Sequence, residues 1–348
     1  MKSGTPILVR RAIGASFAFV ALLLVSAHFG WIGNARAGSV STGPTTGVVN
    51  ITTALGYQGG AAAGTGIVLT SSGDVLTNNH VIRGATRVQV TVPSTGRTYS
   101  ANVVGYSVTA DVALIHVSNA SGLTTAKIGN SSSVQVGRDV TAVGNAGGRG
   151  GTPAVTVGTV TGLHRSITVN DDQGGTARLT DLIQTNASLE PGDSGGPLLD
   201  SSGRVIGMDS AADTGFDFRG GGGSGFAIPI NRALAIVKVV RFGRTVGAVH
   251  VGPTSFLGIS VSSAVRAGGT PSGGALVSGV LPNGPADNAG LGSGDLITSI
   301  AGSSISSPNA LVAALLKIAP GRSVQIHWTD SNGYSHSGTI RPIAGPPQ

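Results

Sequence analysis

The sequence lacks cysteine altogether, and only 4% of its residues are aromatic and 11% charged. Without cysteine the chain has no disulfide bond, no thiolate metal site and no lipoprotein anchor, although this absence does not mark a cytosolic protein. No run of five or more Lys and Arg residues occurs, and aromatic residues are not interleaved with basic ones, so the sequence gives little support to nucleic-acid binding. Glycine is abundant instead, with 57 of 348 residues, which indicates a loop-rich protein.

The first 37 residues have the features of a secretory signal. Lys2, Arg10 and Arg11 precede an apolar run at 12–27, and residues 35–37 form an A-x-A cleavage site. We therefore expect a signal peptide over 1–37 and a secreted or extracytoplasmic protein. The alternative is an uncleaved helix that anchors the protein in the membrane. Removal of this segment, which holds four positive residues and no acid, lowers the net charge of +7 by four to about +3.

After a flexible lead-in at 38–46, residues 47–243 are typical of an all-β domain. Short β-prone segments alternate with turns rich in Gly, Ser and Asn, and no convincing helix interrupts them. The segments are VVNITTAL, GTGIVLT, DVLTNNHVI, RVQVTV, ANVVGY, DVALIHV, DVTAVG, AVTVGTVTGL, LIQTNA, GPLLD and VIGMDSA. The pattern predicts a barrel or sandwich, with two successive six-strand halves, rather than βαβ units. The first clean helical pattern follows at 231–243, with Asn231 as its expected N-cap.

A linker is expected at 244–254, a second and smaller domain at 255–342, and a loose tail at 343–348. The second domain has strand patterns at FLGISV, GALVSGV, DLITSIAG and SVQIHW. A helix fits SPNALVAALLKIAPG, with Ser307 as its cap and a proline at its first position.

Two glycine clusters, at 144–151 and 219–225, resemble phosphate-binding loops only in composition. Neither lies between a strand and a helix, and neither ends in Lys followed by Ser or Thr, so nucleotide binding is not expected. We interpret the second cluster as a surface loop.

Ser194 lies within NASLEPGDSGGP, directly after an acid and between glycines. A serine hydroxyl needs a histidine base and an orienting acid before it can attack a carbonyl group. His80 follows an apolar strand pattern where the strand opens into a turn, and Asp111 lies at the mouth of the strand pattern DVALIHV. A carboxylate in that position needs a partner, which a histidine N–H can supply. The order His80, Asp111, Ser194 divides the three residues between the two halves of the β domain.

The glycines around Ser194 favour an oxyanion-binding loop. Gly192 allows the backbone to turn the N–H groups of Gly192 and Ser194 inward, toward a developing negative charge. Each of these signals is weak alone, but together they predict a serine hydrolase. An esterase of the α/β-hydrolase type is a weaker alternative, because the order Ser, Asp, His and the βα pattern of that fold are absent.

The segments around His80, Asp111 and Ser194 resemble a known family, the HtrA (DegP/DegQ-like) branch of the trypsin-like serine proteases. GTGIVLTSSGDVLTNNHVI, TADVALI, VGNAGG, LIQTNASLEPGDSGGPLLDSSGRVIGM and GFAIPI follow that family in order. FLGISV and GALVSGVLPNGPADNAGLGSGDLITSIAG are similar to a PDZ domain of the same branch. The likeness covers about residues 47–342 and is greatest to secreted PepA-type actinobacterial members.

The resemblance implies a chymotrypsin-like double six-stranded β-barrel followed by a small α+β PDZ domain. It implies that His80 is the general base, Asp111 its orienting acid and Ser194 the nucleophile, with no cofactor or metal. Its oxyanion hole would be the backbone of Gly192, Asp193 and Ser194. The amides of three PDZ residues would bind a peptide C-terminal carboxylate, namely Leu257, Gly258 and Ile259. The family relation also implies unfolded or damaged extracytoplasmic polypeptides as substrates and a homotrimer as the assembly.

The residues around the nucleophile predict which side chain precedes the cleaved bond, the P1 residue. Ser188 is six residues before Ser194 and is uncharged, and Leu189 and Ala212 are expected to line the P1 pocket. A small or medium aliphatic P1 residue is therefore expected, since a buried Lys or Arg would have no anion to pair with. Glu190, the only glutamate, is either an exposed turn charge or a contributor to substrate choice.

Asp193 departs from the family, which commonly has Asn there, and it matches the digestive proteases instead. Those enzymes pair this acid with an apolar mature N-terminus, which the present sequence does not offer. The sequence-based hypothesis is that Arg149, in the glycine cluster 144–151, pairs with Asp193 and orders the loop. A different class of function, a peptide-binding or chaperone-like module with an idle protease site, also remains open.

Overall fold

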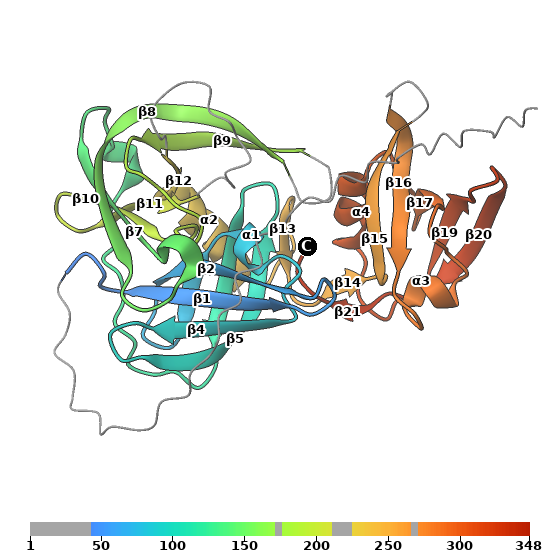
Figure 1. The fold of residues 1–348 in the computed structure, drawn as a ribbon, viewed down its shortest axis with the longest axis horizontal. Helices are drawn as coiled ribbons and strands as arrows, with labels where there is room; N and C mark the ends of the chain where they lie inside the picture. Colours follow the sequence, from blue (N-terminus) through green and yellow to red (C-terminus); the bar gives the residue numbers. More distant parts are fainter. Residues whose placement is uncertain (1–42, 171–175, 211–224, 266–270) are drawn as a thin grey trace, which may run out of the picture. The chain divides into compact units, whose positions relative to one another are not determined.

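The computed structural model describes residues 43–170, 176–210, 225–265 and 271–348. The expected signal peptide at 1–37, the glycine cluster 219–225 except Gly225, and the P1-pocket residue Ala212 therefore lie outside the described residues. Most of the described elements are strands, as the sequence predicts, and they form two barrels, a separate larger sheet and a two-stranded sheet (Figure 1).

The first barrel contains six strands in the order β5-β4-β1-β2-β3-β6, and pairing of β5 with β6 closes it. Its strands are β1 (Val48–Leu55), β2 (Gly60–Val68), β3 (Asp74–Thr77), β4 (Arg87–Val92), β5 (Arg97–Ser107) and β6 (Val112–Val117). A seventh strand, β13 (Val249–Val251), pairs with β5. It lies in the stretch 244–254 that the sequence predicts as a linker. A one-turn helix, α1 (Asn79–Ile82), follows β3 where the sequence pattern predicts only a turn.

The second barrel is closed in the order β10-β11-β12-β9-β8-β7. Its strands are β7 (Asp139–Gly144), β8 (Ala154–Asn170), β9 (Thr176–Thr185), β10 (Pro197–Asp200), β11 (Val205–Asp209) and β12 (Gly225–Pro229). Short 3₁₀ turns occur at η1 (Ser131–Ser133) and η2 (Ala146–Gly148). The prediction of two successive six-strand halves is confirmed, although β12 is not among the strands that the pattern predicts.

Helix α2 (Ile230–Arg241) confirms the helix predicted at 231–243, but the expected cap is wrong. The N-cap is Pro229, which has no side chain to accept a hydrogen bond. Asn231 lies inside the first turn, and its side-chain amide donates to Asn130 Oδ1 and Ser132 Oγ. The helix buries Ile230, Ala233, Val237 and Val240.

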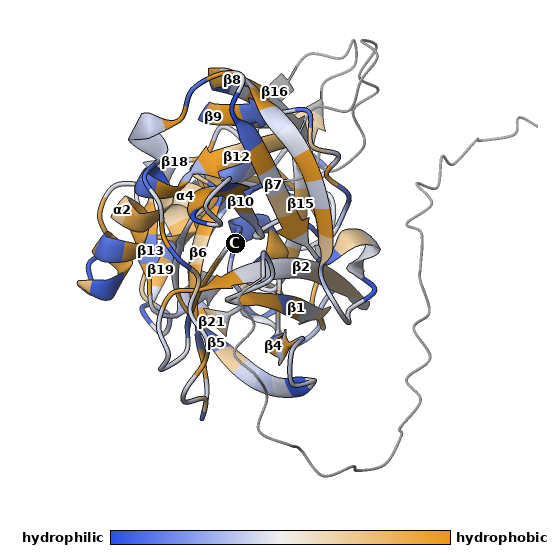
Figure 2. Cartoon of the chain, turned by 90° about the vertical axis from the view of Figure 1, so that its left-hand side faces the viewer, coloured by the Kyte–Doolittle hydropathy of each residue, from blue (hydrophilic) through white to orange (hydrophobic). Residues whose placement is uncertain are grey.

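Hydrophobic and hydrophilic residues alternate along several strands, as the bands of colour in Figure 2 indicate, and most of the buried residues of the barrels are apolar. One buried cluster fills the first barrel, a second lies in the other barrel, and a third joins strands of both barrels to α2. Representative members of the third cluster are Ile67 and Leu114 from the first barrel and Met208 and Ile228 from the second. The two barrels are therefore packed on a shared core, and the loops at their junction have a defined position.

The C-terminal part is a mixed helix and sheet unit with its own core. Its main sheet has the order β15-β16-β17-β19-β20, and β18 pairs with β17. The strands are β15 (Ile259–Val265), β16 (Pro271–Val280), β17 (Leu296–Ile300), β18 (Ser303–Ser304), β19 (Val324–Thr329) and β20 (Ser335–Ile340), and the helices are α3 (Pro285–Asn288) and α4 (Pro308–Leu315). Ser307 caps α4 as predicted, because its Oγ accepts from the N–H of Ala310.

Residues 343–348, which the sequence predicts as a loose tail, are hydrogen-bonded in the structure. β21 (Ile343–Gly345) pairs with β14 (Thr254–Phe256) as a two-stranded antiparallel sheet. The exact domain boundaries stay a prediction. Among the described residues, no helix is long and apolar enough to cross a membrane.

Candidate active site

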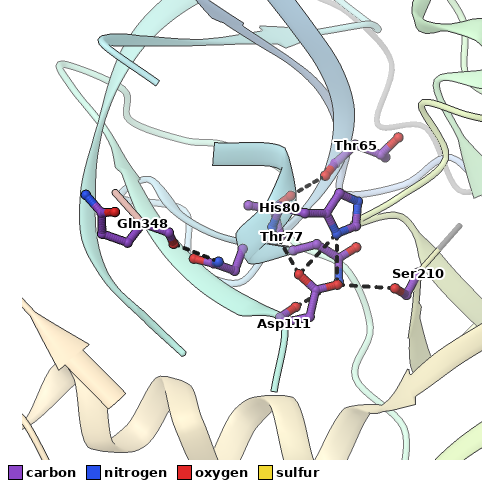
Figure 3. Close-up of polar contacts among 8 residues, drawn as sticks. Thr65, Thr77, His80, Asp111, Ser210 and Gln348 are labelled. Atoms are coloured by element: carbon purple, nitrogen blue, oxygen red, sulfur yellow. Dashed lines mark hydrogen bonds and ion pairs between the residues drawn. The ribbon is translucent and has the colours of Figure 1, made fainter. Parts of the chain in front are cut away.

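The structure brings His80 and Asp111 together. His80 is in α1, and Asp111 lies in the turn before β6 with φ of 53°, in the left-handed region that Asp tolerates better than most residues. The ring Nδ1 of His80 lies 2.9 Å from Asp111 Oδ2 and 3.1 Å from Oδ1, and the backbone N–H of His80 donates to Oδ1 at 3.0 Å (Figure 3). The carboxylate thus favours the tautomer with the proton on Nδ1, which leaves Nε2 as a proton acceptor.

Two further residues hold Asp111, and neither is among the predicted site residues. The side-chain amide of Asn78 donates to the carbonyl oxygen of Asp111 at 2.8 Å, and Ser210 Oγ donates to Oδ2 at 3.2 Å. The Asp111 side chain is 8% exposed, whereas that of His80 is 41% exposed. The acid is therefore nearly buried and well hydrogen-bonded, and the imidazole that it orients is open to solvent.

Ser194 lies in the loop between β9 and β10, against strand β2 of the first barrel. Its carbonyl oxygen accepts from the N–H of Thr65 at 2.8 Å, and the carbonyl oxygen of Thr65 accepts from Thr77 Oγ1 at 2.7 Å. A Cβ atom at Gly64 would lie 2.6 Å from the side chain of Val81 and 3.3 Å from Ser194 O. Ser194 and the residue that follows His80 therefore flank the same glycine.

The carbonyl groups of Pro191 and Asp193 are hydrogen-bonded, and this fixes the direction of the next N–H groups, those of Gly192 and Ser194. The N–H of Gly147 donates to Pro191 O at 2.7 Å, and the N–H of Gly196 donates to Asp193 O at 2.9 Å. In a planar trans peptide the N–H points opposite to the C=O. The amides of Gly192 and Ser194 consequently point away from Gly147 and Gly196, respectively.

The amide of Asp193, in contrast, is used within the turn, because it donates to Glu190 O at 3.0 Å. Of the three residues expected in the oxyanion hole, Asp193 therefore does not offer its N–H to an oxyanion, and its amide instead closes the turn with Glu190. Gly192 has φ of 100°, and a Cβ atom there would lie 2.2 Å from Asn145 O. Only glycine fits this position.

Thr65 connects the nucleophile loop to both barrels, and sequence reasoning missed it. Its Oγ1 donates to Gly192 O at 2.7 Å and accepts from the N–H of Asn145 at 2.8 Å. In addition, the backbone N–H of Thr65 donates to Ser194 O, and its carbonyl oxygen accepts from Thr77 Oγ1. The available signal was a polar residue between two glycines, Gly64 and Gly66, inside a strand pattern.

Two acids, Asp193 and Asp209, lie in or against the loop that carries Ser194, and the contacts of Asp193 differ from those that the sequence-based hypothesis predicts. Asp193 Oδ2 accepts from the N–H of Glu190 at 2.9 Å, but Oδ1 is buried without a hydrogen-bond partner among the described residues. The expected ion pair between Arg149 and Asp193 is therefore not formed. The cluster 144–151 instead reaches the nucleophile loop through the backbone of Gly147.

Asp209, at the end of β11, is fully buried, and neither of its carboxyl oxygens has a partner among the described residues. Burial raises the pKa of the Asp209 carboxyl well above its usual value, and the nearby Asp193 carboxylate raises it further. Burial also raises the pKa of Asp193, against the opposing effect of the Glu190 amide. Asp209 is thus held in a site that favours its protonated form.

The Asp209→Asn variant is expected to be more stable than the parent at neutral and alkaline pH. The folded state binds the Asp209 proton more tightly than the unfolded state, so the parent loses stability as the pH rises above the unfolded value of about 3.9. Asparagine has nearly the same shape and no charge, so the gain should be near zero at about pH 4 and should grow as the pH rises above that value. Urea unfolding across this pH range measures it.

Asp139→Asn, a change of an exposed carboxyl on β7, is the matched control. It should leave the pH dependence of stability unchanged. A stability difference between Asp209→Asn and the parent that does not grow with pH would contradict the interpretation of Asp209.

The remaining predicted residues are placed as follows. Ser188 is exposed, and Leu189 is half-buried beside Gly225, where a Cβ atom would lie 2.8 Å from the leucine side chain. Leu257 is buried and its carbonyl oxygen accepts from Ala286 N at 2.9 Å. Gly258 has φ of 75°, and its carbonyl oxygen accepts from Leu281 N at 2.7 Å. Among the described residues, no three His, Asp or Glu side chains are grouped to hold a metal ion.

Two closed six-stranded barrels, with a His–Asp pair and a glycine-bounded serine at their junction, are the architecture of the trypsin-like peptidases. Residues 64–208 match the trypsin-like peptidase domain, and residues 255–329 match the PDZ domain. The chain is thus a relative of the HtrA-type serine proteases, with a peptidase domain followed by a PDZ domain.

Named relatives support this assignment. The serine protease PepD of Mycobacterium tuberculosis is 36% identical over 305 residues, which are 83% of this chain and 62% of PepD. The putative serine protease HhoA of Synechocystis is 38% identical over 71% of this chain and 62% of HhoA. The periplasmic serine endoprotease DegP of Escherichia coli is 37% identical over 72% of this chain and 51% of DegP. The chain therefore spans less than two thirds of the length of these relatives.

Proposed function

We propose that the protein is a serine endopeptidase in which Ser194 is the nucleophile, His80 the general base and Asp111 the orienting acid. The observation that carries the proposal is the His80–Asp111 pair, in which the carboxylate accepts from both the ring Nδ1 and the backbone N–H of His80. This arrangement fixes the ring orientation and the tautomer that general-base catalysis requires.

The reaction follows from these positions. Ser194 Oγ attacks the carbonyl carbon of the peptide bond, and its proton passes to His80 Nε2. Asp111 stabilises the imidazolium that forms, while the amides of Gly192 and Ser194 donate to the oxyanion. His80 then gives the proton to the leaving nitrogen, the amine departs, and water attacks the acyl-enzyme by the same route in reverse.

The PDZ domain is proposed to bind peptide C-termini at Leu257, Gly258 and Ile259. β15 is the last strand of its sheet among the described residues, so one edge is open to an added strand. Because Gly258 O accepts from the N–H of Leu281, just beyond the end of β16, the N–H of Ile259 on the same peptide plane points away from β16. Gly258 adopts a positive φ that lets the loop turn toward a carboxylate.

The substrates are proposed to be unfolded or damaged polypeptides outside the cytoplasm. The signal-like segment 1–37 supports an extracytoplasmic location, and the relative DegP is named a periplasmic endoprotease. Leu189, half-buried against the apolar cluster of the second barrel, supports the expectation of an aliphatic P1 residue. Oligomerisation as a trimer and the likeness to PepA-type members stay predictions of the family resemblance.

Cleavage of a peptide library by the chain from Gly38 onward tests this function. The expected result is cleavage after Val, Ala and Leu, because Ser188 is uncharged and Leu189 is apolar, so the described part of the P1 pocket does not favour Lys or Arg. Covalent labelling of Ser194 by a fluorophosphonate should accompany it. A profile dominated by Lys and Arg would contradict the P1 prediction, and the absence of both labelling and cleavage would instead support an idle peptide-binding module.

A further inference from the structure

Segment 345–348, which begins at the last residue of β21, lies against the helix that carries His80. The side-chain amide of Asn79 donates to Gln348 O at 3.0 Å, and the N–H of Gly84 donates to Pro347 O at 2.8 Å. Figure 3 shows Gln348 approaching this helix from a different side than Asp111 does. In both contacts the acceptor is a backbone oxygen of the segment.

Asn79 makes this contact important for His80, its neighbour in the chain. The residue is 3% exposed, and its bond to Gln348 is the one side-chain hydrogen bond it forms among the described residues. Loss of Gln348 would remove the one side-chain hydrogen bond that holds Asn79 in its buried position. Asn79 would then have to move, and His80 is attached to it directly.

Helix α1 has little stability of its own. It is four residues long, and the bond from Arg83 N to Asn79 O at 2.9 Å closes its single turn. One isolated helical turn is unfavourable in water, because it fixes several residues for one hydrogen bond. The position of the helix therefore depends on its neighbours. Val81 and Ile82 are buried in the core of the first barrel, and the polar contacts of the helix are made with Asp111 and with segment 345–348.

The segment is itself firmly anchored. The N–H of Gln348 donates to the hydroxyl of Tyr106 at 3.2 Å, and that hydroxyl also bonds Thr254 Oγ1 at 2.8 Å. Tyr106 is fully buried in the first barrel. Pro346 and Pro347 have restricted backbones, so fixing them costs little conformational entropy. These contacts connect the end of β21 to the interior of the first barrel.

We propose that segment 345–348 is a positioning element for the catalytic base: its backbone holds Asn79 and Gly84 and thereby keeps the His80 helix against Asp111. The inference rests on the proposed function for the role of His80. It assigns a part in proteolysis to residues 345–348, which lie outside the match to the peptidase domain at 64–208.

Deletion of residues 346–348 tests the proposal. Amide hydrogen exchange at His80 and Arg83 should become about ten-fold faster, although neither amide touches the deleted residues. In the same variant kcat should fall roughly ten-fold while KM changes less than about two-fold, because the base is misplaced and the substrate-binding surface is intact. A merely destabilised enzyme would instead lose protection throughout both barrels.

Gln348→Ala is the matched control, since the segment contacts α1 through backbone oxygens that this change retains. It should keep the parent values of exchange and kcat. If the deletion prevents folding, Asn79→Ala removes the same contact from the other side and should reproduce the exchange and kcat changes. Parent-like exchange at His80 and Arg83 in a folded variant that lacks the contact overturns the proposal.

The two readouts separate this proposal from the proposed function. Hydrogen exchange requires no proteolysis, so faster exchange in a protein whose parent cleaves nothing would uphold the positioning of α1 and refute the peptidase activity. Unchanged exchange in an active peptidase would refute the positioning of α1 and uphold the peptidase activity.

Discussion

The Ser194→Ala variant is expected to lose peptide hydrolysis by about a million-fold, with the fold unchanged. The change removes one hydroxyl group, without which no acyl-enzyme forms. The interactions that hold the loop use backbone atoms, such as the bond from Thr65 N to Ser194 O, and alanine keeps them. Hydrolysis of the best library peptide and thermal unfolding, measured on the same preparation, check both parts.

Ser202→Ala supplies the control, because Ser202 lies exposed in the turn between β10 and β11. It should hydrolyse the peptide at the parent rate. If Ser194→Ala retained more than a few per cent of the parent activity, the nucleophile would be another residue.

Asp111→Asn is expected to lower kcat by about ten-thousand-fold. The backbone N–H of His80 donates to Oδ1, so the amide oxygen of asparagine would remain there and its NH₂ group would take the place of Oδ2. That NH₂ group would face His80 Nδ1, which then becomes an acceptor and leaves the ring proton on Nε2. A histidine with its proton on Nε2 cannot accept the proton of Ser194.

The loss should not come from misfolding. Asparagine adopts a positive φ as readily as aspartate, and the carbonyl oxygen that accepts from Asn78 is unchanged. Steady-state kinetics and a melting curve distinguish the two causes. Ser210→Ala, which removes a single donor to Oδ2, should cost about ten-fold or less. An equal loss in both variants would show that the tautomer is not what Asp111 controls.

The parts of this site that could be predicted from the sequence are those with a local signal. His80 and Asp111 each lie at the end of a buried strand, and Gly192 marks a turn that only glycine can form. The strands themselves follow from β-branched residues separated by turn residues. These features depend on neighbours a few positions away, and the structure has them where the pattern indicates.

The parts that were missed depend on contacts between distant segments. Ser210 reaches Asp111 and Thr65 reaches Gly192 across about a hundred residues or more. Asn231 has the residue type of an N-cap, but α2 begins one residue earlier. The Asn231 side chain instead donates a hydrogen bond to Asn130, next to the η1 turn. Segment 345–348 contacts α1 through backbone oxygens, so its side chains carry no pattern that could reveal it.

The bonds of Thr65 have a consequence for the chain before it is folded. One barrel contributes the proposed base and acid, the other contributes the proposed nucleophile, and Thr65 joins them only after both barrels have closed. A chain in which only one barrel has folded therefore holds either the proposed base and acid or the proposed nucleophile loop, but not both.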